Sequence, residues 1–481
     1  MTKTFKCVDL FAGCGGLSLG LRAAGFKERL AVEKSEMAAE TYHHNLIAPI
    51  EDVEKWKRDH VCADLAEQAQ RGLVVKELGA LLEREELVES IAAEGIDLVA
   101  GGPPCQGFSM AGRRNPDDAR NRLPWQFLEF VETVKPKAVI IENVSGMKSD
   151  FAKHGKRSPF KELQEALRQT GSGYVAQPLL LNARHFGAPQ NRPRLFLVGI
   201  SRDVADTLGI TVSDTLWSSA DDDGALLPTE GGRPMLAPRR THFSAPELEH
   251  LGQHAARQKE RIVQEALYGL LEGAPSPRSL EYKEVLAGLD QHVTGKKTSG
   301  LKNHNKRRHS DKVTKRFGFY QVATERGLNK LVLGLPYRHD LPREARLEAI
   351  RTTYPGPSEG GGAEFLKDVE TYVQHVQELA TKKHSQRALR LLEPSPTVVS
   401  LPDDFVHPVE PRVPTVRELA RFQTFPDTFE FRAKETTGAH RRRVEVPQYT
   451  QVGNAVPPLL AKALGTRLHQ ILAQVSNEQQ P

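Results

Sequence analysis

Short apolar runs alternate with segments of helical character along the N-terminal part of the chain. Four runs have the length and β-branched content of buried strands: 5–12, 30–33, 96–100 and 138–144. Helical patterns lie between or after them, at 17–25, 36–45, 66–95, 125–134 and 159–170. Strands that alternate with helices are typical of an α/β fold on a mainly parallel sheet, so we predict that class.

The pattern then changes to frequent glycine, proline and charge, without long apolar runs. A helix stopped by proline at 417–426 and a longer helix at 459–472 bring the apolar pattern back. We therefore predict a domain of residues 1–205 that residues 435–481 complete. Residues 206–434 would form a smaller, irregular domain inserted into it.

Composition narrows the class of protein. The chain has 481 residues, of which 39% are hydrophobic and 26% charged, as in ordinary soluble proteins. No run approaches the roughly 18 apolar residues of a membrane span, and the N-terminus enters a strand without a signal-peptide pattern, so we expect a cytoplasmic location. A net charge of +5 is compatible with a nucleic-acid partner. The spacing of the cysteines fits neither a disulfide framework nor a zinc site, so we expect no metal: Cys7, Cys14, Cys62 and Cys105.

A glycine-rich turn, Gly13-Cys14-Gly15-Gly16, joins the first strand to the first helix. Its glycines would let a ligand approach the backbone, and the helix would offer free N–H groups. Glu33 ends the second strand about twenty residues on, where such folds place a carboxylate on ribose. Asp64 is a second acid that could meet an adenine amino group, although a lone loop aspartate usually caps a helix or is solvated. The pattern indicates an adenosine-type cofactor rather than a dinucleotide; a tight turn of any α/β protein is the alternative.

A second loop carries a cysteine directly after a predicted strand. Two glycines at 101–102 are expected to turn the chain sharply, and Pro103 and Pro104 to stiffen it, before Cys105. Such a thiol is either a positioned nucleophile or a buried structural cysteine, at even odds from the loop alone. Glu142 ends the next apolar strand, and the carboxyl ends of neighbouring parallel strands share one crevice.

Three cationic features are weak signals when each is taken alone. Arg192 and Arg194 alternate on one face of a predicted strand. The polar segment 110–123 would be a lid over substrate or a passive surface loop. Residues 296–316 hold nine Lys or Arg and one Asp, a cluster that either neutralises phosphates or is a solvated loop.

The order of these motifs resembles the DNA cytosine-5 methyltransferase family, in particular bacterial restriction-modification methyltransferases. The residues that carry the resemblance follow the order usual in that family: 9–16, Glu33, Asp64, 102–109, 142–144, 190–194, 417–426 and 451–454. The resemblance covers about residues 1–200 and 412–472, with the variable region between them. It implies a Rossmann-like S-adenosylmethionine-dependent methyltransferase domain, into which a target recognition domain is inserted.

The resemblance also assigns the chemistry. Cys105 would add to carbon 6 of cytosine, so that carbon 5 can attack the methyl group of S-adenosylmethionine. Glu142 would protonate ring N3, which requires a raised pKa. Arg192 and Arg194 would hold the base and the cysteine loop, and the base would be flipped out of the duplex. No step needs a metal.

The remaining site residues follow from the same motifs. Those expected at the cofactor are Phe11, Gly13, Gly15, Gly16, Glu33, Asp64, Leu65, Pro103, Asn454 and Val456. Those expected at DNA are Gln106, Ser109, Arg113, Arg114, Lys306, Arg307 and Arg308.

The expected partner is double-stranded DNA, with a cognate restriction endonuclease as a genetic partner, no membrane, and a monomeric enzyme. Three other interpretations remain open. An RNA methyltransferase of the same family is disfavoured by the long insert. A catalytically idle DNA-binding relative could have lost Cys105 or Glu142, and both are present. A nicotinamide-dependent oxidoreductase would have no role for the Pro-Pro-Cys-Gln loop.

Overall fold

The computed structural model describes most of the chain. The described residues are 4–104, 122–144, 159–225, 232–251, 257–271, 276–294, 300–328, 334–358, 362–381, 386–438, 441 and 444–478.

An eight-stranded sheet forms the centre of the molecule, in the order β3-β2-β1-β4-β5-β7-β6-β8. The strands are β1 (Phe5–Leu10), β2 (Phe26–Val32), β3 (Leu73–Val74), β4 (Leu98–Gly101), β5 (Ala138–Val144), β6 (Tyr174–Asn182), β7 (Pro193–Ser201) and β8 (Trp217–Ser218). The strands from β3 to β5 pair in parallel, whereas β7 runs antiparallel to β5 and β6. The chain adds β2 and β3 on one side of β1, and it then returns to add β4 and β5 on the other side. Such a switch point opens a ligand crevice at the carboxyl ends of the strands.

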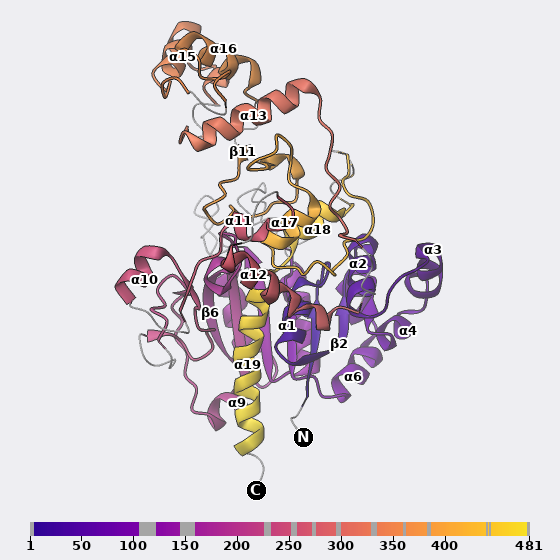
Figure 1. Ribbon diagram of the computed structural model, residues 1–481. Helices are drawn as coiled ribbons and strands as arrows, with labels where there is room; N and C mark the ends of the chain where they lie inside the picture. The colour runs from indigo at the N-terminus through magenta and orange to yellow at the C-terminus, as the bar shows by residue number, and fades with distance from the viewer. Residues whose placement is uncertain are drawn as a thin grey trace.

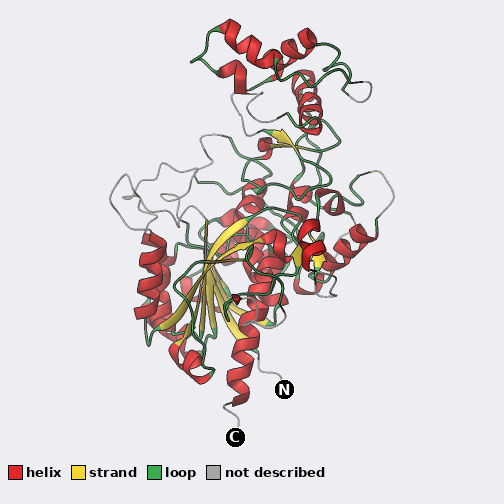
Figure 2. Ribbon diagram, turned by 90° about the vertical axis from the view of Figure 1, so that its left-hand side faces the viewer, coloured by secondary structure: helices red, strands yellow, loops and turns green. Residues whose placement is uncertain are grey.

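Helices cover both faces of this sheet (Figure 2). Along β1, Phe5 and Cys7 pack into a buried cluster with the C-terminal helix, whereas Val8 and Leu10 pack into a cluster on the opposite face. This alternation is expected of a strand buried on both sides. The helices of this part are α1 (Gly16–Ala23), α2 (Glu36–Leu46), α3 (Val53–Trp56), α4 (Leu65–Gln70), α5 (Leu78–Leu82), α6 (Glu85–Ala93), α7 (Leu123–Val134), α8 (Pro159–Gln169), α9 (Arg202–Thr207) and α19 (Pro458–Glu478).

The C-terminal helix α19 lies against α1 on the near side of the molecule (Figure 1). Glycine permits the close contact, because a Cβ atom at Gly20 would lie 2.4 Å from the Cβ of Ala461. The end of the chain therefore completes the hydrophobic layer on the α1 face.

The inserted segment contributes to two buried clusters. One joins Val263, Tyr282 and the helix α17 (Val416–Phe422) to side chains of α2, such as Tyr42. The other is separate and holds α13 (Asp311–Glu325), α15 (Arg343–Arg351) and α16 (Val369–Leu379), which stand away from the sheet in Figure 1. The remaining elements are α10 (Ala245–Leu251), α11 (Val263–Ala266), α12 (Pro277–Ala287), α18 (Gln448–Asn454), β9 (His242–Phe243), β10 (Gln258–Lys259), β11 (Arg387–Ala388) and β12 (Phe405–Val406). The domain boundaries at 205 and 435 stay predictions.

The predicted α/β class is confirmed, but the apolar pattern did not reveal β3, β6 or the two-residue strand β8. β3 has only two residues and lies inside a segment expected to be helical. β6 contains Pro178, which argues against a central strand because proline donates no ladder hydrogen bond. The structure tolerates it, since the short strand β8 pairs with β6 only from Leu179 to Leu180. Among the described residues, no helix is long and apolar enough to cross a membrane.

Candidate active site

Three strand ends lie side by side at the carboxyl edge of the sheet. Leu10 at the end of β1 pairs with Gly101 at the end of β4, and Gly101 pairs with Ile141 of β5. The next residue of each strand is Phe11, Gly102 or Glu142. These three residues therefore lie at the same level along the carboxyl edge of the sheet. The glycine-rich turn after β1 and the cysteine loop after β4 thus both begin at the crevice expected at the switch point.

Glu142 is almost enclosed, with a side chain 14% exposed. Arg194, on the neighbouring strand β7, places its Nε 3.0 Å from Oε1 of Glu142. Burial raises the pKa of Glu142, although the charges of Arg194 and Arg192 oppose that rise. A proton on this carboxyl group therefore persists to higher pH than on an exposed glutamate.

Gly101, the last residue of β4, and Gly102 after it allow close packing rather than a left-handed turn, since neither has a positive φ. A Cβ atom at Gly102 would lie 2.9 Å from Oε2 of Glu142, and one at Gly101 would lie 2.2 Å from the carbonyl oxygen of Leu10. Nδ2 of Asn143 donates to the carbonyl oxygen of Pro103 at 3.2 Å. The start of the cysteine loop is therefore held directly against the Glu142 strand.

Five residues predicted for this loop lie outside the described part of the chain: Cys105, Gln106, Ser109, Arg113 and Arg114. Their roles stay predictions, as does that of most of the segment 110–123.

Arg192 is fully buried and binds the C-terminal segment through its guanidinium group. Its Nη1 donates to the carbonyl oxygen of Val398 at 3.0 Å, and Nη2 donates to those of Gly453 at 2.8 Å and Ala455 at 3.0 Å. Burial lowers the pKa of Arg192, and the neighbouring Arg194 adds to this, whereas Glu142 opposes it. Arg192 and Arg194 thus both lie near Glu142, but only Arg194 forms an ion pair with it.

The glycine-rich turn after β1 has the backbone geometry that a ligand cradle needs. Phe11 and Gly13 have positive φ angles of 61° and 56°, and Gly15 starts α1 without a side chain that could cap its N–H groups. Glu33 accepts hydrogen bonds from the N–H of Gly13 at 2.9 Å and of Ser35 at 2.7 Å. Within the described part of the chain, no packed atom lies within 4 Å of the position that a Cβ of Gly13 would take, so these residues leave the turn open there.

The C-terminal segment closes this turn from the other side. A Cβ atom at Gly16 would lie 2.3 Å from the carbonyl oxygen of Val456, so only glycine fits there. Asn454 is exposed, and Val456 is buried. The structure therefore brings the two predicted cofactor segments, 11–16 and 454–456, into contact, although more than four hundred residues separate them.

Asp64 caps α4, which begins at Leu65, by accepting the N–H of Ala66 at 2.8 Å. Its side chain is 56% exposed and lies 3.6 Å from Nη1 of Arg84. The capping role was the open alternative for this aspartate, and its exposure still allows a ligand contact.

Two glutamines that sequence reasoning gave no role complete the anchoring of the C-terminal segment. Oε1 of Gln190 accepts the N–H of Val398 at 2.7 Å, and its Nε2 donates to Oε1 of Gln423 at 2.9 Å. Nε2 of Gln423 donates to the carbonyl oxygen of Val452 at 2.5 Å. Both glutamines lie in motifs already singled out, 190–194 and 417–426, but neither motif indicates that the two side chains meet.

A buried aspartate lies beneath the glycine-rich turn. Oγ of Ser18 donates to Oδ2 of Asp9 at 2.6 Å and lies 3.0 Å from the hydroxyl of Tyr42. Oδ1 of Asp9 has no hydrogen-bond partner in the described part of the chain. Burial raises the pKa of Asp9 to about 7, the Ser18 hydrogen bond opposing the rise.

Replacing Asp9 by asparagine should remove a pH-dependent part of the stability. The folded chain keeps the Asp9 proton up to about pH 7, whereas the unfolded chain loses it near pH 4. Stability from this group is thus complete below about pH 4 and is lost as the pH rises to about 7, by at most ~1.4 kcal/mol per unit. Urea unfolding at several pH values should show that the free energy of unfolding of D9N rises relative to that of wild type between about pH 5 and 7. Ser18→Ala keeps the carboxyl group and should keep the dependence; parallel curves for wild type and D9N would contradict this assignment.

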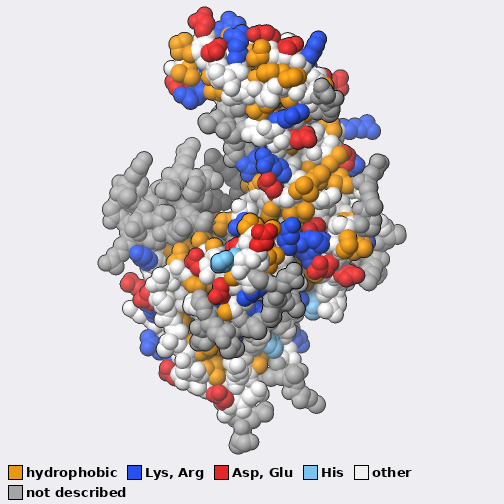
Figure 3. All heavy atoms as spheres, turned by 60° about the vertical axis from the view of Figure 1, so that its left-hand side comes forward, with side chains coloured by type: hydrophobic (Ala, Val, Ile, Leu, Met, Phe, Trp, Pro, Cys, Tyr) orange, Lys and Arg blue, Asp and Glu red, His pale blue; other side chains and the backbone are white. Residues whose placement is uncertain are grey.

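The predicted DNA contacts of the basic cluster are partly engaged by acidic side chains. Nζ of Lys306 lies 2.8 Å from Oε2 of Glu410, and Arg307 lies 3.8 Å from Asp403. Arg308 is exposed and has no ion-pair partner among the described residues. Acidic and basic side chains also intermingle over the α13–α16 unit in Figure 3. Phosphate binding by Lys306 would have to compete with Glu410.

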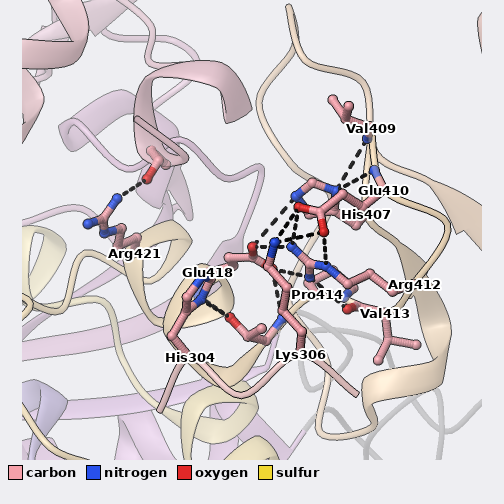
Figure 4. Close-up of polar contacts among 12 residues, drawn as sticks. His304, Lys306, His407, Val409, Glu410, Arg412, Val413, Pro414, Glu418 and Arg421 are labelled. Carbon is pink, nitrogen blue, oxygen red and sulfur yellow. Dashed lines mark hydrogen bonds and ion pairs between the residues drawn. The ribbon is translucent and has the colours of Figure 1, made fainter. Parts of the chain in front are cut away.

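The Lys306–Glu410 ion pair belongs to a network at the start of α17 (Figure 4). Arg412 donates to both carboxylate oxygens of the fully buried Glu418, at 2.8 and 2.7 Å. Glu418 also accepts the N–H of Thr415 at 2.8 Å, and the Thr415 side chain caps the helix. The network fixes the basic segment against α17, which belongs to the cluster shared with α2. In the described ranges, no group of three or more His, Cys, Asp or Glu side chains could hold a metal ion.

Comparison with known proteins identifies the family of this site. Residues 5–470 match the profile of the family described as C-5 cytosine-specific DNA methylase. The type II methyltransferase M.AgeI of Thalassovita gelatinovora is 32% identical over 95% of this chain and 98% of its own. M.DdeI of Desulfomicrobium norvegicum is 29% identical over 96% of this chain and 88% of its own. A crystal structure described as a DNA modification methyltransferase encoded within an E. coli prophage shares the fold, with a TM-score of 0.56 and 21% identity over 98% of this chain and 99% of its own. The chain belongs to the C-5 cytosine-specific DNA methylase family and is a DNA cytosine-5 methyltransferase.

Proposed function

We propose that the protein methylates carbon 5 of a specific cytosine in double-stranded DNA through a covalent adduct at Cys105, with the target base flipped out. The observation that carries this proposal is the position of Glu142. Its carboxylate lies against Gly102, three residues before Cys105, and burial raises its pKa. The proposed proton donor is thus held beside the start of the loop that carries Cys105 in the sequence.

The reaction follows from these groups. The Cys105 thiolate attacks carbon 6 of the ring, and Glu142 gives its proton to N3, so that the ring electrons become an enamine. Carbon 5 then takes the methyl group and loses its own proton to a base. The carbon–sulfur bond then breaks and N3 returns its proton to Glu142, so that the thiolate, the acid and the aromatic ring are all restored. Arg194, paired with Glu142, orients the carboxyl group for this transfer.

The methyl donor that we propose is S-adenosylmethionine, which supplies an electrophilic methyl group. The residues present fit it: among the described residues, none fills the space beside Gly13 and no side chain caps the amides at the start of α1. Glu33 would bind the ribose, Asp64 the adenine, and Asn454 and Val456 would close the pocket. Phe11, Gly15, Gly16, Leu65 and Pro103 would complete its walls.

The inserted segment would bind the duplex and read its sequence. Phosphate contacts from exposed cations such as Arg308 would add affinity without sequence information, whereas base-edge contacts elsewhere would add specificity. Because M.AgeI and M.DdeI are type II methyltransferases, we propose that this enzyme modifies DNA beside a cognate restriction endonuclease.

A trapping experiment tests the covalent step. Duplex DNA with 5-fluorocytosine at the methylated position cannot lose a proton from carbon 5, so the adduct should accumulate. Bisulfite sequencing of plasmid from an expressing strain identifies that position first. Incubation with S-adenosylmethionine and the fluorinated duplex should then give a DNA-linked peptide that contains Cys105. The exposed Cys62 supplies the control, because Cys62→Ser should trap normally whereas Cys105→Ser should not.

A methylation assay with the same protein distinguishes a DNA substrate from an RNA substrate. Tritium transfer to a duplex that carries the identified site should greatly exceed transfer to tRNA. Methylated product without any trapped peptide would reject the Cys105 mechanism, and methylated tRNA with unmodified DNA would reject the substrate.

A further inference from the structure

A cationic cavity of about 580 Å³ lies beside α19, on the α1 face of the sheet. Its walls come from the turn after η5 (Ala183–Phe186), the segment 233–242, α12 and α19. α19 presents residues to it at helical spacing from Leu459 to Gln470, while the opposite side of the helix packs into the sheet. Among the described residues, none of those predicted for catalysis or for the cofactor lines this cavity.

The cavity has an excess of positive charge. Five cations line it, Arg233, Arg239, Arg261, Lys462 and Arg467, and no carboxylate does within the described part of the chain. Arg233 and Arg261 are paired elsewhere, with Asp222 at 3.5 Å and Glu281 at 2.7 Å.

Three of these cations have no carboxylate partner among the described residues: Arg239, Lys462 and Arg467. Nε of Arg467 donates only to the carbonyl oxygen of Met235, at 2.6 Å. Burial lowers the pKa of Arg467, and the charge of Arg233 adds to this. Like charges gathered without compensation favour an anion between them.

A buried histidine adds an independent sign of a ligand. His242 lines the cavity with 7% of its surface exposed, and its Nε2 has no hydrogen-bond partner in the described ranges. Burial, together with the charges of Arg261, Arg278 and Arg240, lowers the pKa of His242 to about 3, so the ring is neutral. Oγ1 of Thr241 lies 2.9 Å from Nδ1 and 3.4 Å from the carbonyl oxygen of His185. When the Thr241 hydroxyl donates along the shorter of these two contacts, to Nδ1, the proton on Nε2 is free for an acceptor.

Apolar side chains also line the cavity, namely Phe186, Pro238, Leu459 and Ala463, together with the uncharged polar Gln258, Thr466 and Gln470. A cavity lined by both cations and apolar side chains suits an organic anion better than a bare ion. Its volume lies within the range of about 300–1,000 Å³ that is usual for small-molecule sites.

We propose that this cavity is a second binding site, which takes an organic polyphosphate of nucleotide size. Arg239, Lys462 and Arg467 would neutralise the phosphates, and Nε2 of His242 would donate to a phosphate oxygen. The apolar wall would receive the uncharged part of the ligand. Bound there, the ligand would join the inserted segment 233–242 to α19, away from the methylation chemistry.

Thermal unfolding of the full chain tests this site. S-adenosylhomocysteine is kept saturating to fill the proposed cofactor pocket, and inorganic tripolyphosphate or ATP is titrated at constant ionic strength. Both should raise the unfolding temperature saturably, ATP more than tripolyphosphate. Losing two charge-assisted contacts in R239Q/K462Q should weaken this binding at least about tenfold.

The matched control is K55Q/R58Q, which removes the same net charge from side chains 65% and 69% exposed on α3 and just beyond it. It should bind both probes like wild type. Lys462 is exposed, so K462Q alone keeps the fold and should show a smaller loss. Equal responses in the two double variants, or no saturable shift in wild type, would overturn the proposal. A third outcome would also overturn the proposal: wild type binds no polyphosphate, and R239Q/K462Q binds duplex DNA more weakly than wild type. The cavity would then contact the DNA backbone instead.

Discussion

Replacing Glu142 by glutamine should lower the rate of methyl transfer by about 10²–10⁴-fold while leaving binding of DNA and cofactor nearly unchanged. Glutamine has the shape of glutamic acid, and its amide oxygen can still accept from Arg194. It cannot transfer a proton to ring N3. The effect should therefore appear in kcat, measured by tritium transfer to the duplex, rather than in the affinity measured by fluorescence anisotropy.

The pH profile identifies the Glu142 effect as chemical. Burial raises the pKa of Glu142, so the wild-type rate should fall as the pH rises through that value and the donor loses its proton. E142Q should lack this descending limb. The exposed Glu129 on α7 offers the same substitution as a control, and E129Q should keep both the rate and the profile. An E142Q enzyme within about tenfold of wild type would exclude Glu142 as the proton donor.

Replacing Arg192 by methionine should lower the free energy of unfolding by about 3 kcal/mol or more. The guanidinium group satisfies the carbonyl oxygens of Val398, Gly453 and Ala455, and methionine would leave all three without that donor. The segment after Gly453 also closes over Gly16, so the loss should extend to the affinity for S-adenosylmethionine. Urea unfolding measures the first effect, and calorimetric titration of the cofactor measures the second.

Arg58 supplies the comparison, because its side chain is 69% exposed. R58M should change stability by less than about 0.5 kcal/mol and leave cofactor affinity intact. R192K restores a charge but only a single donor centre, so it should recover part of the stability. If R192M were as stable as R58M, the three carbonyl contacts would have no net role in holding the segment.

Much of the site could be predicted because its residues stand at strand ends. Glu33 and Glu142 each follow an apolar run, and the parallel sheet brings such ends to one edge whatever the rest of the chain does. The glycine-rich turn was equally visible, since Gly13 and Gly15 have the positive φ angles that a strand-to-helix turn requires. The strands β3, β6 and β8 were missed, because β3 and β8 have only two residues each and Pro178 argues against β6.

Contacts between distant segments had no local signal. The sequence pattern predicted Arg192 as one of two arginines on a strand face, but the fold places it against carbonyl groups more than two hundred residues away. Lys306 read as a phosphate contact, and the structure pairs it with Glu410. Gly102 read as a turn residue, and its role is close packing against Glu142. In each case the partner is set by how the layers pack and not by neighbouring residues.

The sequence by itself thus determined the α/β class, the glycine-rich turn, the acids at the strand ends and the family. These follow from the strand and helix periodicities and from motifs whose chemistry is confined to a few adjacent residues. The tertiary structure alone decided that Arg192, Gln190 and Gln423 anchor the C-terminal segment, and that α19 and the insert enclose a cationic cavity. The physical reason is that burial and charge compensation depend on which surfaces meet, and these surfaces come from segments far apart in the chain.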